Sequence, residues 1–118
     1  MGVALRPTDP LVLRYIEELK ARGLERDIDL IIPSSEVFEI GERFAEAHRS
    51  YAELLNELAN YVKPRINADV ANSVVGEYLG GANVDAVDIL AKRLAKWYID
   101  ILRLFNVIQF SGFQPPSE

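Results

Sequence analysis

The fold is decided by two stretches of sequence: EVFEIGERFAEAHRSYAELLNELANYV at residues 36–62 and VDAVDILAKRLAKWYIDILRLFNVI at residues 84–108. In both, apolar side chains recur at alternating steps of three and four residues, the spacing of a seam between packed helices. The first stripe comprises Val37, Gly41, Phe44, His48, Tyr51, Leu55, Leu58 and Val62, and the second comprises Val84, Val87, Ala91, Leu94, Tyr98, Ile101, Phe105 and Ile108. The pattern predicts two long helices that pack antiparallel.

Two shorter helices are expected beside the long ones. One runs from about residue 10 to 22, because Asp9 and Pro10 form a helix start, and the other runs from about 68 to 79 behind Asn67. Pro64 is predicted to end the long helix over 36–62 before the helix over 68–79 begins. Residues 27–32 are predicted to be an extended connector, with a strand as the alternative. The expected fold is an all-α four-helix bundle with two long helices (about 36–62 and 84–108) and two shorter ones.

Composition narrows the class of protein. The chain has 118 residues, of which 49% are hydrophobic and 26% charged, as in an ordinary globular protein. We expect one domain over residues 1–118 with short flexible ends at 1–8 and 111–118. No cysteine is present, which excludes disulfides and thiolate sites. The start of the chain lacks a signal-peptide pattern, and residues 89–108 carry too many charges for a membrane span, so we expect a cytoplasmic protein.

Arg43 and His48 form the pattern R-x-x-x-x-H. The pattern resembles the catalytic signature of the HEPN domain family, small all-helical proteins that include RNA-cleaving toxins. The resemblance implies that His48 exchanges a proton with a ribose 2′-hydroxyl and that Arg43 holds the cleaved phosphate. This chain has Phe44 after the arginine, where the family usually has a polar residue, and its motif lies in the second helix. The alternative, which we favour, is a structural His48 in the seam with Arg43 facing solvent.

A basic ribbon on the last predicted helix indicates a second possible activity. It consists of Lys92, Arg93, Lys96 and Arg103, with Trp97 and Tyr98 interleaved, and such a face is typical of single-stranded nucleic-acid binding. The net charge of −5 opposes binding to phosphate backbones, which favours an ordinary solvated face. The chain has one histidine and no carboxylate–histidine pattern of a metal-binding bundle, so we expect neither a metal nor another cofactor.

Apolar surface is the feature most relevant to function. The two short helices are too short to cover both long ones, so some large apolar side chains are expected to form an interface: Leu54, Tyr61, Leu90, Trp97, Leu104 and Phe105. The sequence therefore predicts a non-enzymatic interaction or assembly module that binds a second copy of itself or another protein. The alternative is a nucleic-acid-processing protein, either a HEPN-like ribonuclease or a small nucleic-acid-binding subunit.

Overall fold

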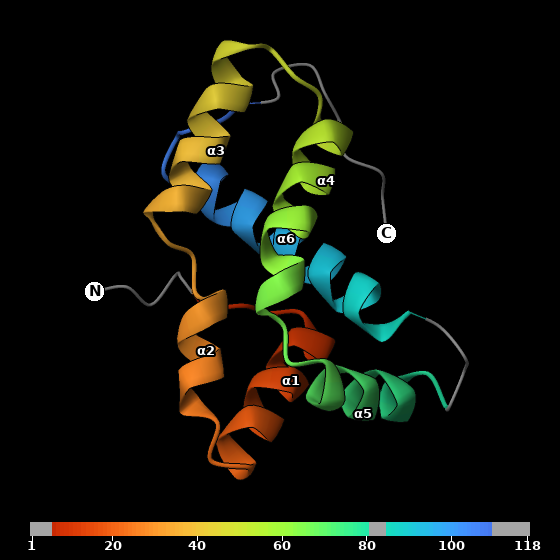
Figure 1. Ribbon diagram of the computed structural model, residues 1–118. Coiled ribbons are helices and arrows are strands. Elements are labelled where there is room, and N and C mark those ends of the chain that lie inside the picture. The colour runs from red at the N-terminus through yellow and green to blue at the C-terminus, as the bar shows by residue number, and fades with distance from the viewer. Residues whose placement is uncertain (1–5, 81–84, 110–118) are drawn as a thin grey trace.

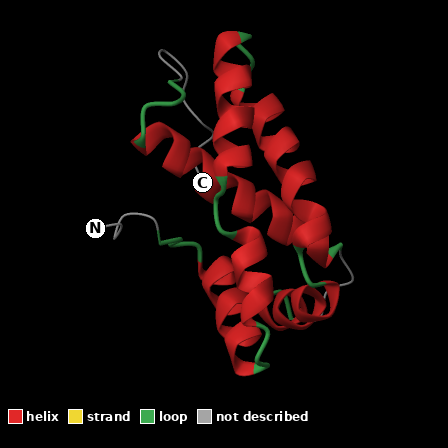
Figure 2. Ribbon diagram, turned by 60° about the vertical axis from the view of Figure 1, so that its left-hand side comes forward, coloured by secondary structure: helices red, strands yellow, loops and turns green. Residues whose placement is uncertain are grey.

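The computed structural model describes residues 6–80 and 85–109, and every regular element within them is helical (Figure 2). The all-α prediction is therefore confirmed. The α-helices are α1 (Pro10–Ala21), α2 (Glu25–Ile31), α3 (Ser35–Glu46), α4 (Tyr51–Val62), α5 (Ala68–Tyr78) and α6 (Ala86–Leu104), and a 3₁₀ turn, η2 (Lys63–Arg65), joins α4 to α5.

Helix α6 is the element around which the others are arranged (Figure 1). Helices α3 and α4 stand side by side at one end of the molecule, whereas α1, α2 and α5 gather at the other. Helix α6 contacts α1, α3, α4 and α5, and its most extensive contact is with α4. Ten of its residues are buried. The helix predicted over 84–108 is thus observed as the long central helix, but it begins at Ala86 and ends at Leu104, four residues before the predicted end.

The predicted long helix over 36–62 is not observed as one helix. Helix α3 ends at Glu46, and His48 adopts a left-handed conformation with φ of 54°. The backbone N–H of Arg49 donates to the carbonyl of Phe44 at 3.0 Å, and that of His48 donates to the carbonyl of Ala45 at 3.1 Å. This pair of bonds is the Schellman motif, which ends a helix by satisfying its last carbonyls.

The next helix begins immediately with a capping box. The hydroxyl of Ser50 accepts from the backbone N–H of Glu53 at 3.2 Å, and the carboxylate of Glu53 accepts from the backbone N–H of Ser50 at 3.0 Å. Helices α3 and α4 each have 12 residues, against 19 in α6. The predicted bundle of two long antiparallel helices is consequently not observed. The pattern S-x-x-E at this position was a start signal that the apolar periodicity concealed.

The prediction of an extended connector over residues 27–32 is also wrong. These residues lie mostly in α2, which follows α1 after a turn at Gly23 with φ of 71°. Ile31 is buried and Ile28 is half-buried, three positions apart on the side of the helix that packs on the core. Helix α2 stops before Pro33. The apolar residues of this segment therefore pack as a helix against α1, although their composition favours a strand.

Other predicted boundaries agree with the structure. The Asp9 side chain accepts from the backbone N–H groups of Leu11 and Val12, and the Asn67 side chain accepts from that of Val70. The break near Pro64 is the 3₁₀ turn. Helix α6 is capped by Asp85. Of the ends predicted to be flexible, residues 1–5 and 111–118 lie outside the described residues, as does residue 84, the predicted start of the last helix.

Two tyrosine hydroxyls join distant segments inside the core. The hydroxyl of Tyr98 donates to the carbonyl of Ile31 at 2.6 Å, which fixes the end of α2 on α6. The hydroxyl of Tyr15 accepts from the backbone N–H of Asn67 at 2.8 Å, which fixes the start of α5 on α1. Burial raises the pKa of both hydroxyls, so both remain protonated at neutral pH.

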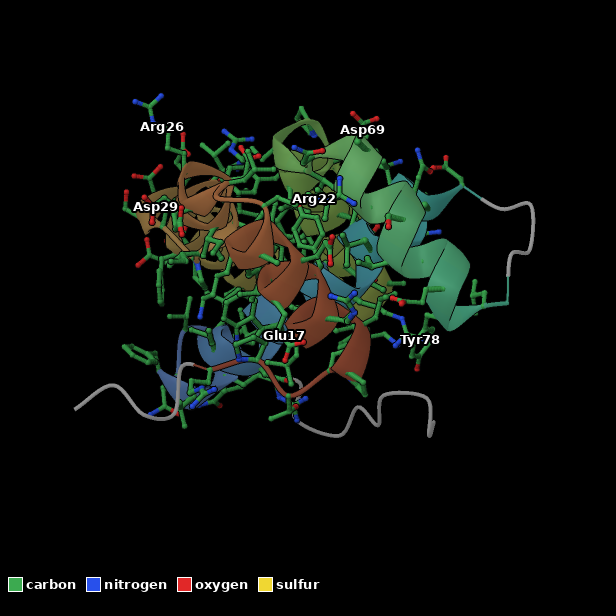
Figure 3. The ribbon with its side chains drawn as sticks, turned by 90° about the horizontal axis from the view of Figure 1, so that it is seen from below. Glu17, Arg22, Arg26, Asp29, Asp69 and Tyr78 are labelled. Carbon is green, nitrogen blue, oxygen red and sulfur yellow. The ribbon has the colours of Figure 1, made fainter. Side chains whose placement is uncertain are left out.

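The surface at the α1–α2 end is charged. Arg26 and Asp29 of α2 project away from the body, and Glu17 and Arg22 of α1 lie nearer the middle of the same view (Figure 3). The guanidinium of Arg22 donates to the carboxylate of Glu18 at 2.8 Å. Within residues 6–80 and 85–109, no helix is long and apolar enough to cross a membrane.

Candidate interaction surface

A groove runs along one face of α6, and it consists of two adjoining parts. Arg6, Trp97 and Ile101 line both parts. We call this feature the Trp97 groove. Its walls come from segments far apart in the sequence, because the residues before α1, the loop after α2 and the end of α6 meet there.

The first part of the Trp97 groove is almost entirely apolar. It is a depression of about 420 Å³. Besides the shared residues, its lining includes Ile16, Ile28, Ile32, Pro33, Phe38 and Phe105. The rings of Phe38 and Phe105 have centroids 5.6 Å apart and are tilted by 58°, a favourable arrangement for an aromatic pair. This part therefore offers aliphatic and aromatic surface to whatever enters it.

The second part contains charged groups. It is a depression of about 560 Å³ whose lining includes Thr8, Asp9, Arg93, Lys96, Asp100 and Leu104. Arg93 donates to both carboxylate oxygens of Asp9, at 3.2 and 2.9 Å. Burial raises the pKa of Asp100, and the charge of Arg103 opposes this rise. Lys96 and Arg6 are exposed, and neither forms an ion pair with any residue in the described ranges.

Large apolar side chains stand exposed beside the groove. Leu104 is 55% exposed, Phe105 54% and Ile32 49%. They lie at the end of α6 and where the chain leaves α2. Exposed apolar groups of this size, gathered at a groove, are a common mark of a binding surface.

Trp97 carries a buried donor without an acceptor. The side chain is 8% exposed, and its indole Nε1 has no hydrogen-bond partner among the described residues. Leaving a buried donor unpaired costs about 1–3 kcal/mol. The indole packs against the ring of Tyr98, with centroids 5.7 Å apart. A hydrogen bond from Nε1 to an acceptor outside the chain would remove this cost.

The structure divides the predicted basic ribbon. Lys92 pairs with Asp88 at 3.1 Å, and Arg93 pairs with Asp9 while its guanidinium lies 5.3 Å from the ring centroid of Tyr78. Lys96 lines the Trp97 groove, and Arg103 is exposed on the same helix. The four residues therefore do not form one uninterrupted cationic face, since two of them are already neutralised by carboxylates.

The residues predicted to form an interface fall into three groups. Trp97, Leu104 and Phe105 gather at the Trp97 groove. Tyr61 is half-buried at the α3–α4 side, where its hydroxyl bonds to the Ser34 hydroxyl and donates to the Glu36 carboxylate, both at 3.0 Å. Leu54 and Leu90 are in the core, 1% and 0% exposed. In this conformation the last two stabilise the fold and are not available to a partner.

His48 is placed differently from the seam position favoured by the sequence. It is exposed, because it belongs to the loop between α3 and α4 and its left-handed backbone directs the chain away from the helix axis. It lines a second depression of about 590 Å³, together with Arg49, Tyr51, Asn106 and Ile108.

Arg43 does not line the depression beside His48. It is exposed on α3, and the arginine that does line the depression is Arg49. The guanidinium of Arg49 donates to the Glu53 carboxylate at 2.9 Å and lies 5.1 Å from the ring centroid of Phe44. The structure therefore does not bring the two motif residues together in one depression.

Sequence reasoning missed several residues of the Trp97 groove. Arg6, Ile28, Ile32 and Phe38 were not singled out, because each comes from a different segment and none belongs to a motif. One signal was present: the run Leu30, Ile31 and Ile32 is apolar throughout, and a short surface helix can bury only some of it. Leu30 and Ile32 are indeed exposed.

Comparisons of the chain with protein-family models, with curated proteins and with solved structures found no significant match. Within the part of the chain that the structure describes, no three histidine or acidic side chains are close enough to hold a metal ion. The functional argument therefore rests on the geometry of the surface.

Proposed function

We propose that this protein is a non-enzymatic interaction module, which binds another protein or a second copy of itself through the Trp97 groove. The observation that carries the proposal is the coincidence, at one place, of an apolar depression, large exposed apolar side chains and the unpaired Nε1 of Trp97. Each of these features costs free energy in an isolated chain, and a partner that covers the groove removes the cost.

The test compares the wild type with the double variant Leu104→Ser, Phe105→Ser. Both side chains are more than half exposed, so the variant should fold normally. Leu79→Ser is the matched control, because Leu79 is also an exposed leucine but follows α5 and does not line the groove. Light scattering and affinity capture with mass spectrometry measure self-association and partner binding.

We expect the double variant to lose an association that the wild type and Leu79→Ser retain. A wild-type mass equal to the 13.3 kDa chain at high micromolar concentration, together with identical captured proteins for all three, would contradict the proposal.

A second candidate function, RNA cleavage, is favoured by one observation: His48 is exposed and lines a depression. We rank it lower because Arg43 lies outside that depression and Arg49 is held by Glu53. Incubating RNA with the wild type, Arg43→Ala and His48→Ala tests it. We expect no cleavage by any of the three, and wild-type cleavage abolished by both substitutions would replace the interaction proposal.

Nucleic-acid binding through the ribbon is disfavoured for an electrostatic reason. Two of the four cations are paired with Asp88 and Asp9, and the chain as a whole is acidic. To contact all four cations, a phosphate backbone must therefore displace two existing ion pairs. Fluorescence anisotropy with a labelled single strand checks this, and we expect no salt-dependent binding in the micromolar range.

A further inference from the structure

The charge around the Trp97 groove indicates what kind of partner it fits. The polar part of the groove is lined by three cationic side chains, Arg6, Arg93 and Lys96, and two carboxylates, Asp9 and Asp100. The chain as a whole carries a net charge of −5. The groove is therefore a locally basic place on an acidic protein, and one carboxylate, Asp9, is already bound to Arg93.

Two cations remain available to a ligand. Arg6 and Lys96 are exposed, and within the described ranges they have no ion-pair partner. Arg6 lines both parts of the groove, so its charge lies beside the apolar part as well. A ligand that brings carboxylates to these two groups gains charge-assisted hydrogen bonds without breaking an existing one.

The apolar part of the groove and the indole of Trp97 set the other requirements that a ligand must meet. The apolar depression lined by Phe38 and Phe105, which we call the Phe38–Phe105 depression, accepts large apolar side chains, because their burial removes apolar surface from water. Nε1 of Trp97 is a donor and needs an acceptor oxygen. Nε1 is itself buried, so a ligand reaches it only when side chains of the groove move aside.

A second copy of this chain is a poorer occupant than a different protein. In a symmetric dimer the same patch lies on both sides of the interface, so each copy brings the same excess of cationic side chains to it. Like charges placed together across an interface are unfavourable. The exposed apolar side chains alone favour self-pairing, whereas the charges oppose it.

We propose that the Trp97 groove binds an acidic amphipathic segment of a partner protein, with its apolar side chains in the Phe38–Phe105 depression and its carboxylates on Arg6 and Lys96. This inference rests on the proposed function and specifies the partner. Binding of this kind places one face of a helix in a groove, with apolar anchors every three or four residues and charges at the rim.

The test uses Trp97 itself, which is the only tryptophan in the chain and therefore reports directly on the groove. Two designed peptides of about four helical turns serve as probes. Both carry the same leucine and phenylalanine face, and the polar face is glutamate in one and lysine in the other. Titration of each peptide into the wild type is followed by tryptophan fluorescence and by calorimetry.

We expect the glutamate peptide to bind at least about tenfold more tightly than the lysine peptide, since tenfold corresponds to the strength of one or two such ion pairs. The double variant Arg6→Glu, Lys96→Glu should reverse the preference. Lys20→Glu is the control, because Lys20 is exposed on α1 and does not line the groove. Trp97→Phe removes the indole donor and should weaken binding of the glutamate peptide by about two- to tenfold, as measured by calorimetry.

Equal binding of the two peptides, no binding of either, or an unchanged preference in the double variant would overturn the inference. A dimer that is lost in Leu104→Ser, Phe105→Ser and that excludes the glutamate peptide would also overturn it. That last result supports the proposed interaction function, so the two proposals fail separately.

Discussion

The close approach of α3 to α6 at Gly41 yields the sharpest prediction about the fold. Gly41 lies inside α3 and is buried. A methyl group added there would meet both terminal carbons of Leu102 at 2.9 Å and Cγ1 of Val107 at 3.3 Å. Leu102 is fully buried, so its side chain has little room to move aside. Gly76 in α5 is the matched control, because no atom lies within 4 Å of the corresponding methyl position.

Two opposing effects set the magnitude. Replacing a glycine inside a helix by alanine stabilises the folded state by about 0.5–1 kcal/mol, because it restricts the unfolded chain. Overpacking a buried contact costs about 1–3 kcal/mol. We therefore expect Gly76→Ala to raise the free energy of unfolding by about 0.5–1 kcal/mol and Gly41→Ala to lower it by about 1 kcal/mol.

Thermal unfolding followed by circular dichroism measures the difference. For a chain of 118 residues, 1 kcal/mol corresponds to about 4 °C in Tm. The two variants should thus differ by about 6–8 °C, with the wild type between them. If Gly41→Ala is stabilised as much as Gly76→Ala, then α3 does not approach α6 closely and the assigned packing is wrong.

Three further predictions concern single contacts. Tyr98→Phe leaves the carbonyl of Ile31 without its donor and should cost about 1–3 kcal/mol, measured by urea unfolding; no change would refute the buried bond. His48→Gly should raise Tm and His48→Leu should lower it, because the left-handed backbone at this position favours glycine over residues with a side chain. The opposite order would indicate that α3 and α4 form one continuous helix. Arg49 holds the pKa of Glu53 at about 2, below 4.5, so its stabilising effect is present above pH 4.5 and lost as pH falls toward 2. The Tm difference between wild type and Glu53→Gln should shrink over that range, and a constant difference would contradict the capping box.

The prediction for His48→Leu reverses what the sequence suggests. With His48 in a continuous seam, leucine extends the apolar run and stabilises the helix. In the structure the residue is exposed and has φ of 54°, a backbone conformation in which a leucine side chain is strained. The periodicity across this position is real in the sequence but spans two helices.

Most helix boundaries were readable because local chemistry decides them. Asp9 and Asn67 have side chains that satisfy the free N–H groups at a helix start, and Pro64 cannot continue a helix. The break after Glu46 was harder to read. Its stop signal is a histidine rather than a glycine, and its start signal, Ser50 with Glu53, lies inside an apolar pattern that continues in phase.

The Trp97 groove could be predicted only in part. Trp97, Leu104 and Phe105 were identifiable as apolar residues in excess of what one seam buries, and Lys96 as part of a basic ribbon. Their neighbours Arg6, Ile28, Ile32 and Phe38 were not, because the spacing along α6 carries no information about which other segments reach it.

By itself, the sequence determined the helical class, most of the helix starts and stops, and the amphipathic character of α6, because capping, proline geometry and apolar spacing act within a few residues. Only the tertiary structure decided which apolar residues lie in the core and which remain exposed. Leu90 and Leu104 look alike in sequence, yet the first is 0% and the second 55% exposed. Their difference depends on which helices cover each part of α6, which is a property of packing between distant segments rather than of any local pattern.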